Sequence, residues 1–170
     1  VEGFTVQGAA NSISYGIFLS NSSPTLSNNI ITGGTVTANG SSYGIYCNSS
    51  APTISNNTMT GGLATGGGAT SYGLYNNSSS PVISGNTISG GSGNVSRGIS
   101  NTASSPTITN NTINGGQIPG GSGASYGIEN LSSSSPVISN NIINGGTSLA
   151  GNSAGIYNTL SSPTISGNTI

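Results

Sequence analysis

Aliphatic side chains recur along this chain at three fixed places in a repeat of about 28 residues. Each repeat contains a glycine that precedes isoleucine or leucine, and we call the two residues the marker glycine and the marker isoleucine. The marker glycines are Gly16, Gly44, Gly73, Gly98, Gly127 and Gly155. A pair of adjacent glycines lies further along the repeat, and Arg97 replaces the tyrosine that usually precedes the marker glycine in one repeat. A unit of this length cannot hide its apolar face alone and has to stack on its neighbours. The period therefore predicts a solenoid.

Each aliphatic position forms a column through the repeats. The columns are Ile17, Ile45, Leu74, Ile99, Ile128 and Ile156; Leu26, Ile54, Ile83, Ile108, Ile138 and Ile165; and Ile31, Met59, Ile88, Ile113, Ile143 and Ile170. Thr, Ser and Val flank the second column on both sides, which is the period of two expected of a strand. Pro, Asn, Ser and paired Gly lie where the chain has to turn. We predict an all-β protein, a parallel β-helix (β-solenoid) of about six coils of 25–29 residues with three short strands per coil.

Asparagine occupies one further position in every repeat, at Asn29, Asn57, Asn86, Asn111, Asn141 and Asn168. Asparagine tolerates a left-handed backbone, and its amide can both donate to and accept from the equivalent side chain one coil away. We expect a structural ladder of stacked asparagines, with an amide-lined binding site as the alternative. A second ladder is expected in the column Leu19, Cys47, Asn76, Asn101, Asn130 and Asn158, where apolar residues replace asparagine in the first two coils.

Several short segments of the sequence resemble the repeats of right-handed parallel β-helix proteins that bacteria secrete or carry on their surface. They are Ser42–Tyr46, Ser80–Ser84 and Asn86–Gly91, and Gly3–Gly8 looks like the coil that precedes such arrays. The resemblance covers the whole chain and implies a right-handed β-solenoid with an extracellular or cell-surface location. Members of this group include pectin-degrading enzymes, periplasmic maturation proteins, adhesins and fibres, so the resemblance does not fix a function.

Charged side chains make up 2% of the chain, and His, Lys and Asp are absent. The enzymes of the resembling group use clustered carboxylates, but Glu2 and Glu129 are the only two here and lie about four coils apart. Calcium and zinc sites lack their usual Asp, His and Cys ligands. We therefore expect no catalytic residue, no metal and no cofactor, and we predict that the protein is not an enzyme.

The remaining ionisable residues have structural interpretations. Strand parity predicts that Arg97 and Glu129 lie on different faces, with at most a loose surface ion pair. Cys47 is expected to act as a small apolar residue, with a reactive thiol as the alternative. A net charge of −1 disfavours nucleic acids and anionic membranes as partners, and no apolar run is long enough to insert into a bilayer.

Two outward rows are candidates for ligand binding. The residues after the marker isoleucines include Phe18, Tyr46, Tyr75 and Tyr157, with breaks at Ser100 and Glu129. Such a row can stack on sugar rings or can stiffen the sheet by stacking between coils. A second tyrosine column, Tyr15, Tyr43, Tyr72 and Tyr126, shares parity with the marker isoleucines and is expected to close a corner.

The strand after each proline carries the second candidate row, Thr25, Thr53, Thr107, Thr109 and Thr164. Flat arrays of threonine resemble those of ice-binding β-solenoids, although Thr and Ser are also ordinary residues of exposed strands. Ice binding is therefore an alternative function of the chain, beside carbohydrate binding by the tyrosine row.

The chain begins inside one coil and stops inside the sixth, without a capping helix or a charged terminal turn. We expect residues 1–170 to form a single β-solenoid domain, a fragment of a longer array. The low net charge favours association. The sequence thus predicts a non-catalytic extracellular structural protein, such as a segment of a fibre, sheath, stalk or adhesin. Its expected partners are further copies of itself, bound end to end or laterally, or a cell-surface polysaccharide.

Overall fold

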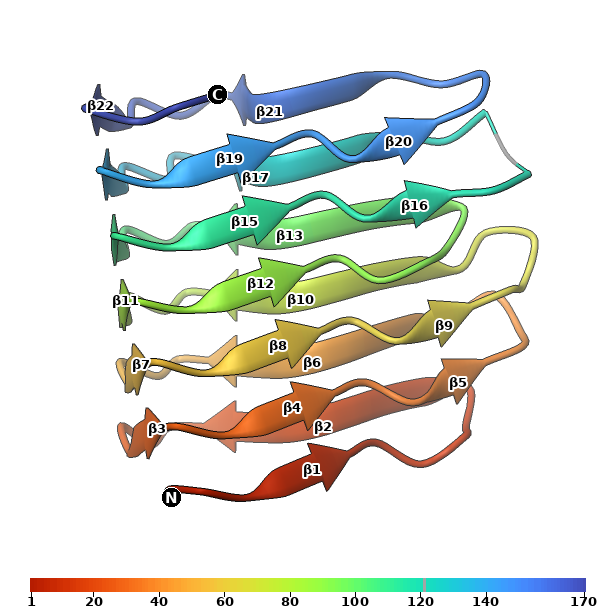
Figure 1. Cartoon of the computed structure of the whole chain (residues 1–170), viewed down its shortest axis with the longest axis horizontal. Coiled ribbons are helices and arrows are strands. Elements are labelled where there is room, and N and C mark those ends of the chain that lie inside the picture. Colours follow the sequence, from red (N-terminus) through yellow and green to blue (C-terminus); the bar gives the residue numbers. More distant parts are fainter. Residues whose placement is uncertain (121) are drawn as a thin grey trace.

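The structure, a computed structural model, describes residues 1–120 and 122–170. The described residues form strands and turns, and the strands stack into three parallel six-stranded sheets (Figure 1). We name these sheets by their places in Figure 1. The front sheet contains β1 (Thr5–Gln7), β4 (Ile30–Thr32), β8 (Thr58–Thr60), β12 (Thr87–Ser89), β15 (Thr112–Asn114) and β19 (Ile142–Asn144). Every neighbour in this sheet is one coil away in the sequence.

The other two sheets complete each coil. The rear sheet contains β2 (Ile13–Ser20), β6 (Ser41–Asn48), β10 (Thr70–Asn77), β13 (Val95–Thr102), β17 (Ser125–Leu131) and β21 (Ser153–Thr159). The end sheet contains β3 (Thr25–Ser27), β7 (Thr53–Ser55), β11 (Val82–Ser84), β14 (Thr107–Thr109), β18 (Val137–Ser139) and β22 (Thr164–Ser166), and is seen on its edge in Figure 1. The predicted all-β fold, a parallel β-helix with three strands per coil, is confirmed.

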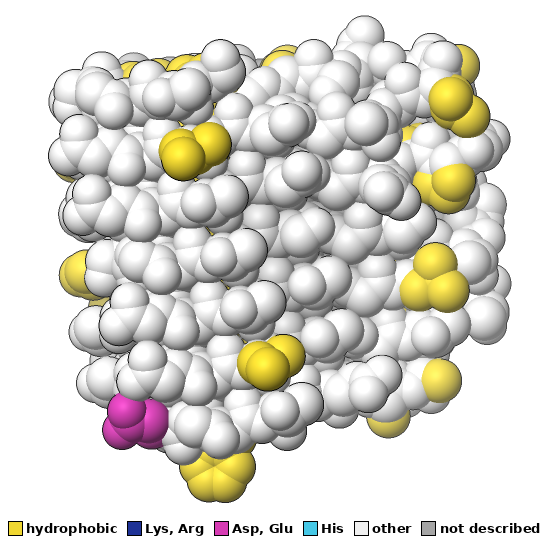
Figure 2. Space-filling view, in the orientation of Figure 1, with side chains coloured by type: hydrophobic (Ala, Val, Ile, Leu, Met, Phe, Trp, Pro, Cys, Tyr) yellow, Lys and Arg dark blue, Asp and Glu magenta, His cyan; other side chains and the backbone are white. Residues whose placement is uncertain are grey.

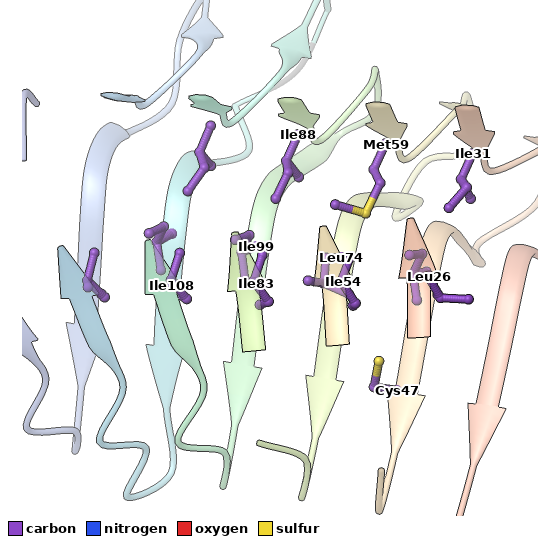
Figure 3. Packing of buried hydrophobic residues seen from close by; sticks show 14 of the residues in the cluster. Leu26, Ile31, Cys47, Ile54, Met59, Leu74, Ile83, Ile88, Ile99 and Ile108 are labelled. Atoms are coloured by element: carbon purple, nitrogen blue, oxygen red, sulfur yellow. The ribbon is translucent and has the colours of Figure 1, made fainter. Parts of the chain in front are cut away.

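The three aliphatic columns fill the interior, as predicted, except in the last coil, where Ile165 and Ile170 are 43% and 68% exposed. Residues of one column are direct partners across neighbouring strands, for example Ile54 with Ile83 and Ile83 with Ile108. These three side chains are fully buried, and Figure 3 shows them in line from coil to coil, with Ile31, Met59 and Ile88 forming a parallel line. Each buried side chain of this kind contributes about 1.5–3 kcal/mol of transfer free energy, so the columns supply the main stabilisation of a chain that is rich in glycine and serine.

A fourth, shorter strand, which the predicted three strands per coil did not include, follows the paired glycines. It is present as β5 (Thr35–Val36), β9 (Leu63–Ala64), β16 (Gln117–Ile118) and β20 (Thr147–Ser148). Val36, Ala64 and Ala69 form a second apolar cluster beneath it, and Ile118 is buried too. The inserts of variable length begin beyond this strand, so the front of the molecule is wider than three-residue strands alone would make it.

Left-handed backbone occurs at the corner between the end sheet and the front sheet, but one residue earlier than expected. The residues with positive φ are Asn28, Asn56, Gly85, Asn110, Asn140 and Gly167, with φ between 55° and 67°. Each of them precedes a ladder asparagine. Asparagine and glycine adopt this conformation at little cost, so the first residue of the pair makes the turn and the second is free to point inward.

The alternation of inward and outward side chains breaks at the marker glycine. This break contradicts both the expected position of the second tyrosine column and the expected separation of Arg97 from Glu129. Gly44 and Ile45 are both buried, while Tyr43 and Tyr46 on either side are both half-exposed. The pairing of β6 with β10 skips the glycine, because it joins Tyr43 to Tyr72 and then Ile45 to Leu74. A Cβ on Gly44 would lie 2.9 Å from the carbonyl oxygen of Thr60, so only glycine fits this bend. The second tyrosine column therefore points outward and does not close a corner.

Candidate functional site

The two tyrosine columns of the rear sheet form one aromatic surface. Tyr15, Tyr43 and Tyr72 stack face to face, with centroid distances of 5.2 and 5.0 Å and interplanar angles of 10° and 5°. The row of Phe18, Tyr46 and Tyr75 packs beside them, since the ring of Tyr46 meets that of Tyr43 edge-on at 5.0 Å. Edge-to-face and offset-stacked rings attract each other beyond the area they bury. This packing stiffens the outer side of the sheet.

The geometry of this surface limits how a sugar can bind to it. Tyr46 stacks on Tyr75 at 5.1 Å, and Phe18 lies 5.4 Å from Tyr46, so the rings of the candidate row cover much of each other's faces. Phe18 is 51% exposed and Tyr157, which stacks on Tyr126, is 39% exposed. Ring edges are therefore the main surface left for a ligand in the middle of the row. Glycan stacking by these residues stays a prediction.

Arg97 and Glu129 form a buried ion pair, contrary to the prediction that they lie on different faces. The guanidinium Nε of Arg97 contacts Oε2 of Glu129, and the two side chains are 16% and 5% exposed. The reversal of parity at Gly98 brings them together, because Arg97 lies in the column of Tyr126 and Glu129 lies in the neighbouring row of Tyr46. Ser100 completes the cluster, since its hydroxyl donates to Glu129 Oε2 over 2.9 Å.

This cluster fills the positions at which aromatic rings are missing from the two rows. The guanidinium carbon of Arg97 lies 5.6 Å from the ring centroid of Tyr72 and 5.7 Å from that of Tyr126, so the planar cation continues the stack between them. Glu129 replaces an aromatic residue and neutralises the cation. The three polar residues thus occupy the places of three rings. Because its charges are paired and hidden, the cluster contributes almost no charge to the outer surface.

Two ladders of hydrogen-bonded asparagine side chains stabilise the coil. The main ladder lies at the corner between the end and front sheets, and the shorter one lies at the end of the rear strands. In the main ladder, the backbone amide of each asparagine donates to Oδ1 of the next, from Asn29 through Asn57, Asn86, Asn111 and Asn141 to Asn168, over 2.8–2.9 Å. In the shorter ladder, Nδ2 of Asn76 donates to Oδ1 of Asn101 over 2.8 Å, and the pattern continues to Asn158. The first five asparagines of the main ladder are buried, so their amides serve the fold.

A third ladder was missed in the sequence. Serine occupies the position two residues before proline in all six repeats. The backbone amide of Ser50 donates to Oγ of Ser79 over 3.0 Å, that of Ser79 to Ser104 over 2.9 Å, and that of Ser104 to Ser134 over 3.1 Å. These four serines are 0–4% exposed. Their invariance within the repeats is the signal that could have revealed the ladder.

Cys47 lies in the interior at the start of the shorter ladder. It is fully buried, and burial raises the pKa of its thiol to about 12. It pairs with Asn76, whose Oδ1 is buried without a hydrogen-bond partner among the described residues. Figure 3 shows the sulfur atom inside the coil. These surroundings fit a small apolar residue, because a reactive thiol needs access to solvent and a lowered pKa.

The end sheet carries the candidate ice-binding row. Thr25, Thr53, Thr107 and Thr164 lie in one exposed column, in register with Val82 and Val137, whereas Thr109 lies in the neighbouring column with five serines. All six residues of the exposed column are β-branched. The strands of this sheet are three residues long, so the row forms a narrow ridge.

The front sheet presents a wider surface, which we call the front face. Its outward residues form three columns: Thr5, Ile30, Thr58, Thr87, Thr112 and Ile142; Gln7, Thr32, Thr60, Ser89, Asn114 and Asn144; and Thr35, Leu63, Ser92, Gln117 and Thr147. Figure 2 shows this face as mostly white, which marks backbone and uncharged polar side chains, with scattered hydrophobic side chains and a single acidic patch at its lower left. The outward residues of this face do not stand out in the sequence.

A shallow groove lies on the front face in the coils of β12, β15 and β19, where residues of all three columns line it, including Thr112 of the first, Asn114 of the second and Gln117 of the third. It has a volume of about 430 Å³, and Gly91, Gly116 and Gly146 are among the residues that line it. All three glycines have positive φ, between 78° and 97°. Their Cβ positions would collide with the glycines of the preceding coil, so no side chain can fill the groove.

Within the described residues, no three His, Cys, Asp or Glu side chains come together in a way that could hold a metal ion. The exposed carboxylate of Glu2 accepts a hydrogen bond of 2.7 Å from Asn28 Nδ2, at the first coil. It therefore lies far from the paired carboxylate of Glu129. The described residues 1–120 and 122–170 contain no helix that is both long and apolar enough to cross a membrane.

Taken together, the three stacked parallel sheets, the inward aliphatic columns and the polar ladders define a parallel β-solenoid with a packed interior. The chain belongs to the right handed beta helix region family, whose model matches residues 1–170. This match confirms the family resemblance of the repeats and gives the handedness of the coil. No curated protein matches the chain significantly.

Proposed function

We propose that this protein is a non-catalytic extracellular structural β-solenoid, a segment of a fibre, sheath, stalk or adhesin, and that it associates laterally with copies of itself. The observation that carries the proposal is the nature of the outer surface. Long columns of exposed Thr, Val, Ile, Ser and Asn run along the front and end sheets, and Arg97 and Glu129 neutralise each other within the rear sheet. Rods with such a surface have little electrostatic repulsion to keep them apart.

The chemistry of the carboxylates also supports a structural function. Glycoside cleavage needs two carboxyl groups about 5–10 Å apart on either side of the substrate bond. Glu129 is bound to Arg97 and Ser100 and is almost inaccessible, while Glu2 lies at the first coil. The hydroxyl groups of the many serines have no histidine to activate them. The residues therefore suit a scaffold better than a catalyst.

Sedimentation velocity over a hundredfold range of protein concentration tests the proposal. We expect the weight-average sedimentation coefficient to rise with concentration and to change little between low and high salt, because the association involves few charges. Negative-stain images at the upper concentrations should show laterally paired or bundled rods. A protein that stays monomeric at every concentration and salt would contradict self-association.

Ice binding is a second candidate, favoured by one observation. The threonines of the end sheet and of the front face lie in register on parallel strands, and most of them are exposed. Thermal hysteresis and ice recrystallisation assays on the same samples distinguish this function from lateral association. Activity of the monomer at dilutions where no association occurs would favour ice binding over the structural function.

A further inference from the structure

The front face differs from the other two faces in width and in shape. Its outward columns extend over residues 30–36 of a single coil, compared with three residues on the end sheet. The rear sheet carries the aromatic rows and the ion pair, so it is less even. On the front face, the exposed first column, which we call the raised column, stands at one edge, and in the coils of β12, β15 and β19 the groove extends from this column across the second column to the glycines.

The raised column is rigid and partly apolar. It consists of Thr5, Ile30, Thr58, Thr87, Thr112 and Ile142, and every member is β-branched and exposed. Ile30 and Ile142 are 53% and 58% exposed, and Leu63 in the third column is 44% exposed. β-branched side chains have few rotamers to lose on contact with a partner. Burying these aliphatic groups would therefore be favourable at a low entropic cost.

The raised column and the groove have the same spacing, because both advance by one residue per coil. We propose that the front face is a self-association surface, on which the raised column of one copy lies against the glycine groove of a second copy and the reverse contact forms at the same time. This inference rests on the proposed function and names the surface that serves it. The occupant is a second copy of this chain because the face is uncharged over most of its area and its two features complement each other.

The symmetry of such a contact fixes how the two copies run. If the column of each copy faces the groove of the other, the two-fold axis must lie between column and groove, parallel to the rod. The two rods then point in the same direction, and the second column, which includes Thr60 and Ser89, lies close to the axis. An antiparallel pair would instead place each column against the same column of the partner.

The available area is sufficient for a specific but weak dimer. Seven residues at about 3.3 Å and six strands at about 4.8 Å give a flat footprint of roughly 600 Å² on each copy, or roughly 1,200 Å² in total. This value lies at the lower limit of standard protein interfaces. Each further coil in a longer array would add to the footprint, so affinity should increase with the number of coils.

Sedimentation of matched lysine variants tests the surface. Thr87→Lys places a charge in the raised column, and Thr107→Lys places the same charge on the exposed column of the end sheet. We expect Thr87→Lys to weaken the dimer at least about tenfold and Thr107→Lys to leave it as in the unaltered protein, with both variants melting near the wild-type temperature. Dimers of Thr87→Lys with unchanged affinity would overturn this surface, even if the protein self-associates elsewhere. A monomeric wild type would overturn the proposed self-association together with it.

Disulfide cross-linking tests the parallel arrangement. Under mild oxidation, Thr60→Cys should give a covalent dimer, because this residue would face the same residue of the second copy near the two-fold axis. Thr112→Cys should face a glycine of the second copy and remain monomeric. The unaltered protein provides the background, since Cys47 is fully buried. Efficient cross-linking through Thr112→Cys would place this column against itself, and cross-linking through neither residue would indicate antiparallel rods or a contact through another surface. Either result would overturn the proposed contact.

Discussion

At the scale of single residues, the departures from the repeat are more informative than its consensus. Arg97, Ser100 and Glu129 occupy places where other coils carry aromatic rings, and the structure joins them in one cluster. The sequence showed that these residues interrupt the rows, but it did not show that they meet. Their contact depends on the reversal of parity at Gly98, which a strict period of two does not contain.

Replacing Arg97 with the tyrosine of the other coils tests this cluster. Arg97→Tyr should destabilise the protein by about 3 kcal/mol, because it leaves Glu129 buried without a counter-charge. Adding Glu129→Tyr should restore most of the lost stability, since two rings then replace the ion pair in both columns. Urea unfolding of the wild type, the two single variants and the double variant measures the coupling.

A cycle in which the two substitutions are simply additive would contradict the buried pair. The single variant Glu129→Tyr serves as the complementary control, because it leaves the partly exposed Arg97 without its carboxylate. We expect it to cost less than Arg97→Tyr, since the guanidinium retains its contacts with Tyr72 and Tyr126 and some access to water.

At the scale of elements, the aliphatic spacing was sufficient to predict the sheets. Residues such as Ile54, Ile83 and Ile108 repeat at a fixed distance from proline, and each is paired with the next in the structure. The short strand after the glycine pair was missed because it has only two residues and lies beside inserts of variable length. The serine ladder was missed because serine is so common in this chain that its invariance at one position did not stand out.

The glycine pair is the element whose function is easiest to test. Gly91 has a φ of 80°, and a Cβ there would lie 2.7 Å from the backbone nitrogen of Gly62 and also against the Gly62 carbonyl oxygen. Gly91→Ala should therefore cost roughly 2–4 kcal/mol, from the left-handed backbone and the collision between coils. Thermal or urea unfolding measures the loss.

Gly120→Ala provides the matched control, because no atom of the described residues beyond its chain neighbours lies within 4 Å of the Cβ position at Gly120. Its stability should stay within about 0.5 kcal/mol of the wild type. If both alanine variants unfolded at the wild-type midpoint, the coils could not be packed as closely at the glycine column as the structure indicates. The groove on the front face would then lose its physical basis.

At the scale of the whole molecule, the scarcity of charge decides what the protein can do. The sequence predicts little acid–base or metal chemistry, because the side chains that such chemistry uses are scarce. It could not identify the front face, since the outward residues of its three columns are ordinary strand residues. Their significance depends on the groove beside them and therefore on the arrangement of several coils.

The same scarcity predicts how stability depends on pH. Without histidine, no side chain has an ordinary pKa near neutrality, so the unfolding free energy should be nearly constant from about pH 6 to 8.5. Burial raises the pKa of the Cys47 thiol to about 12 and also raises the pKa of Tyr43, Tyr46, Tyr72 and Tyr126. Stability should therefore decrease above about pH 9.

The direction of this pH dependence follows from the number of protons that the folded and unfolded states bind. Between the unfolded and folded pKa values, the unfolded chain has lost protons that the folded protein still holds, so each further rise in pH favours unfolding. Urea midpoints measured from pH 6 to 11 test this decline, and Tyr43→Phe should make it shallower because one phenol with a raised pKa is removed. A midpoint that is still constant at pH 11 would mean that the thiol and the phenols ionise as easily in the folded protein as in the unfolded chain, which is incompatible with a closely packed solenoid.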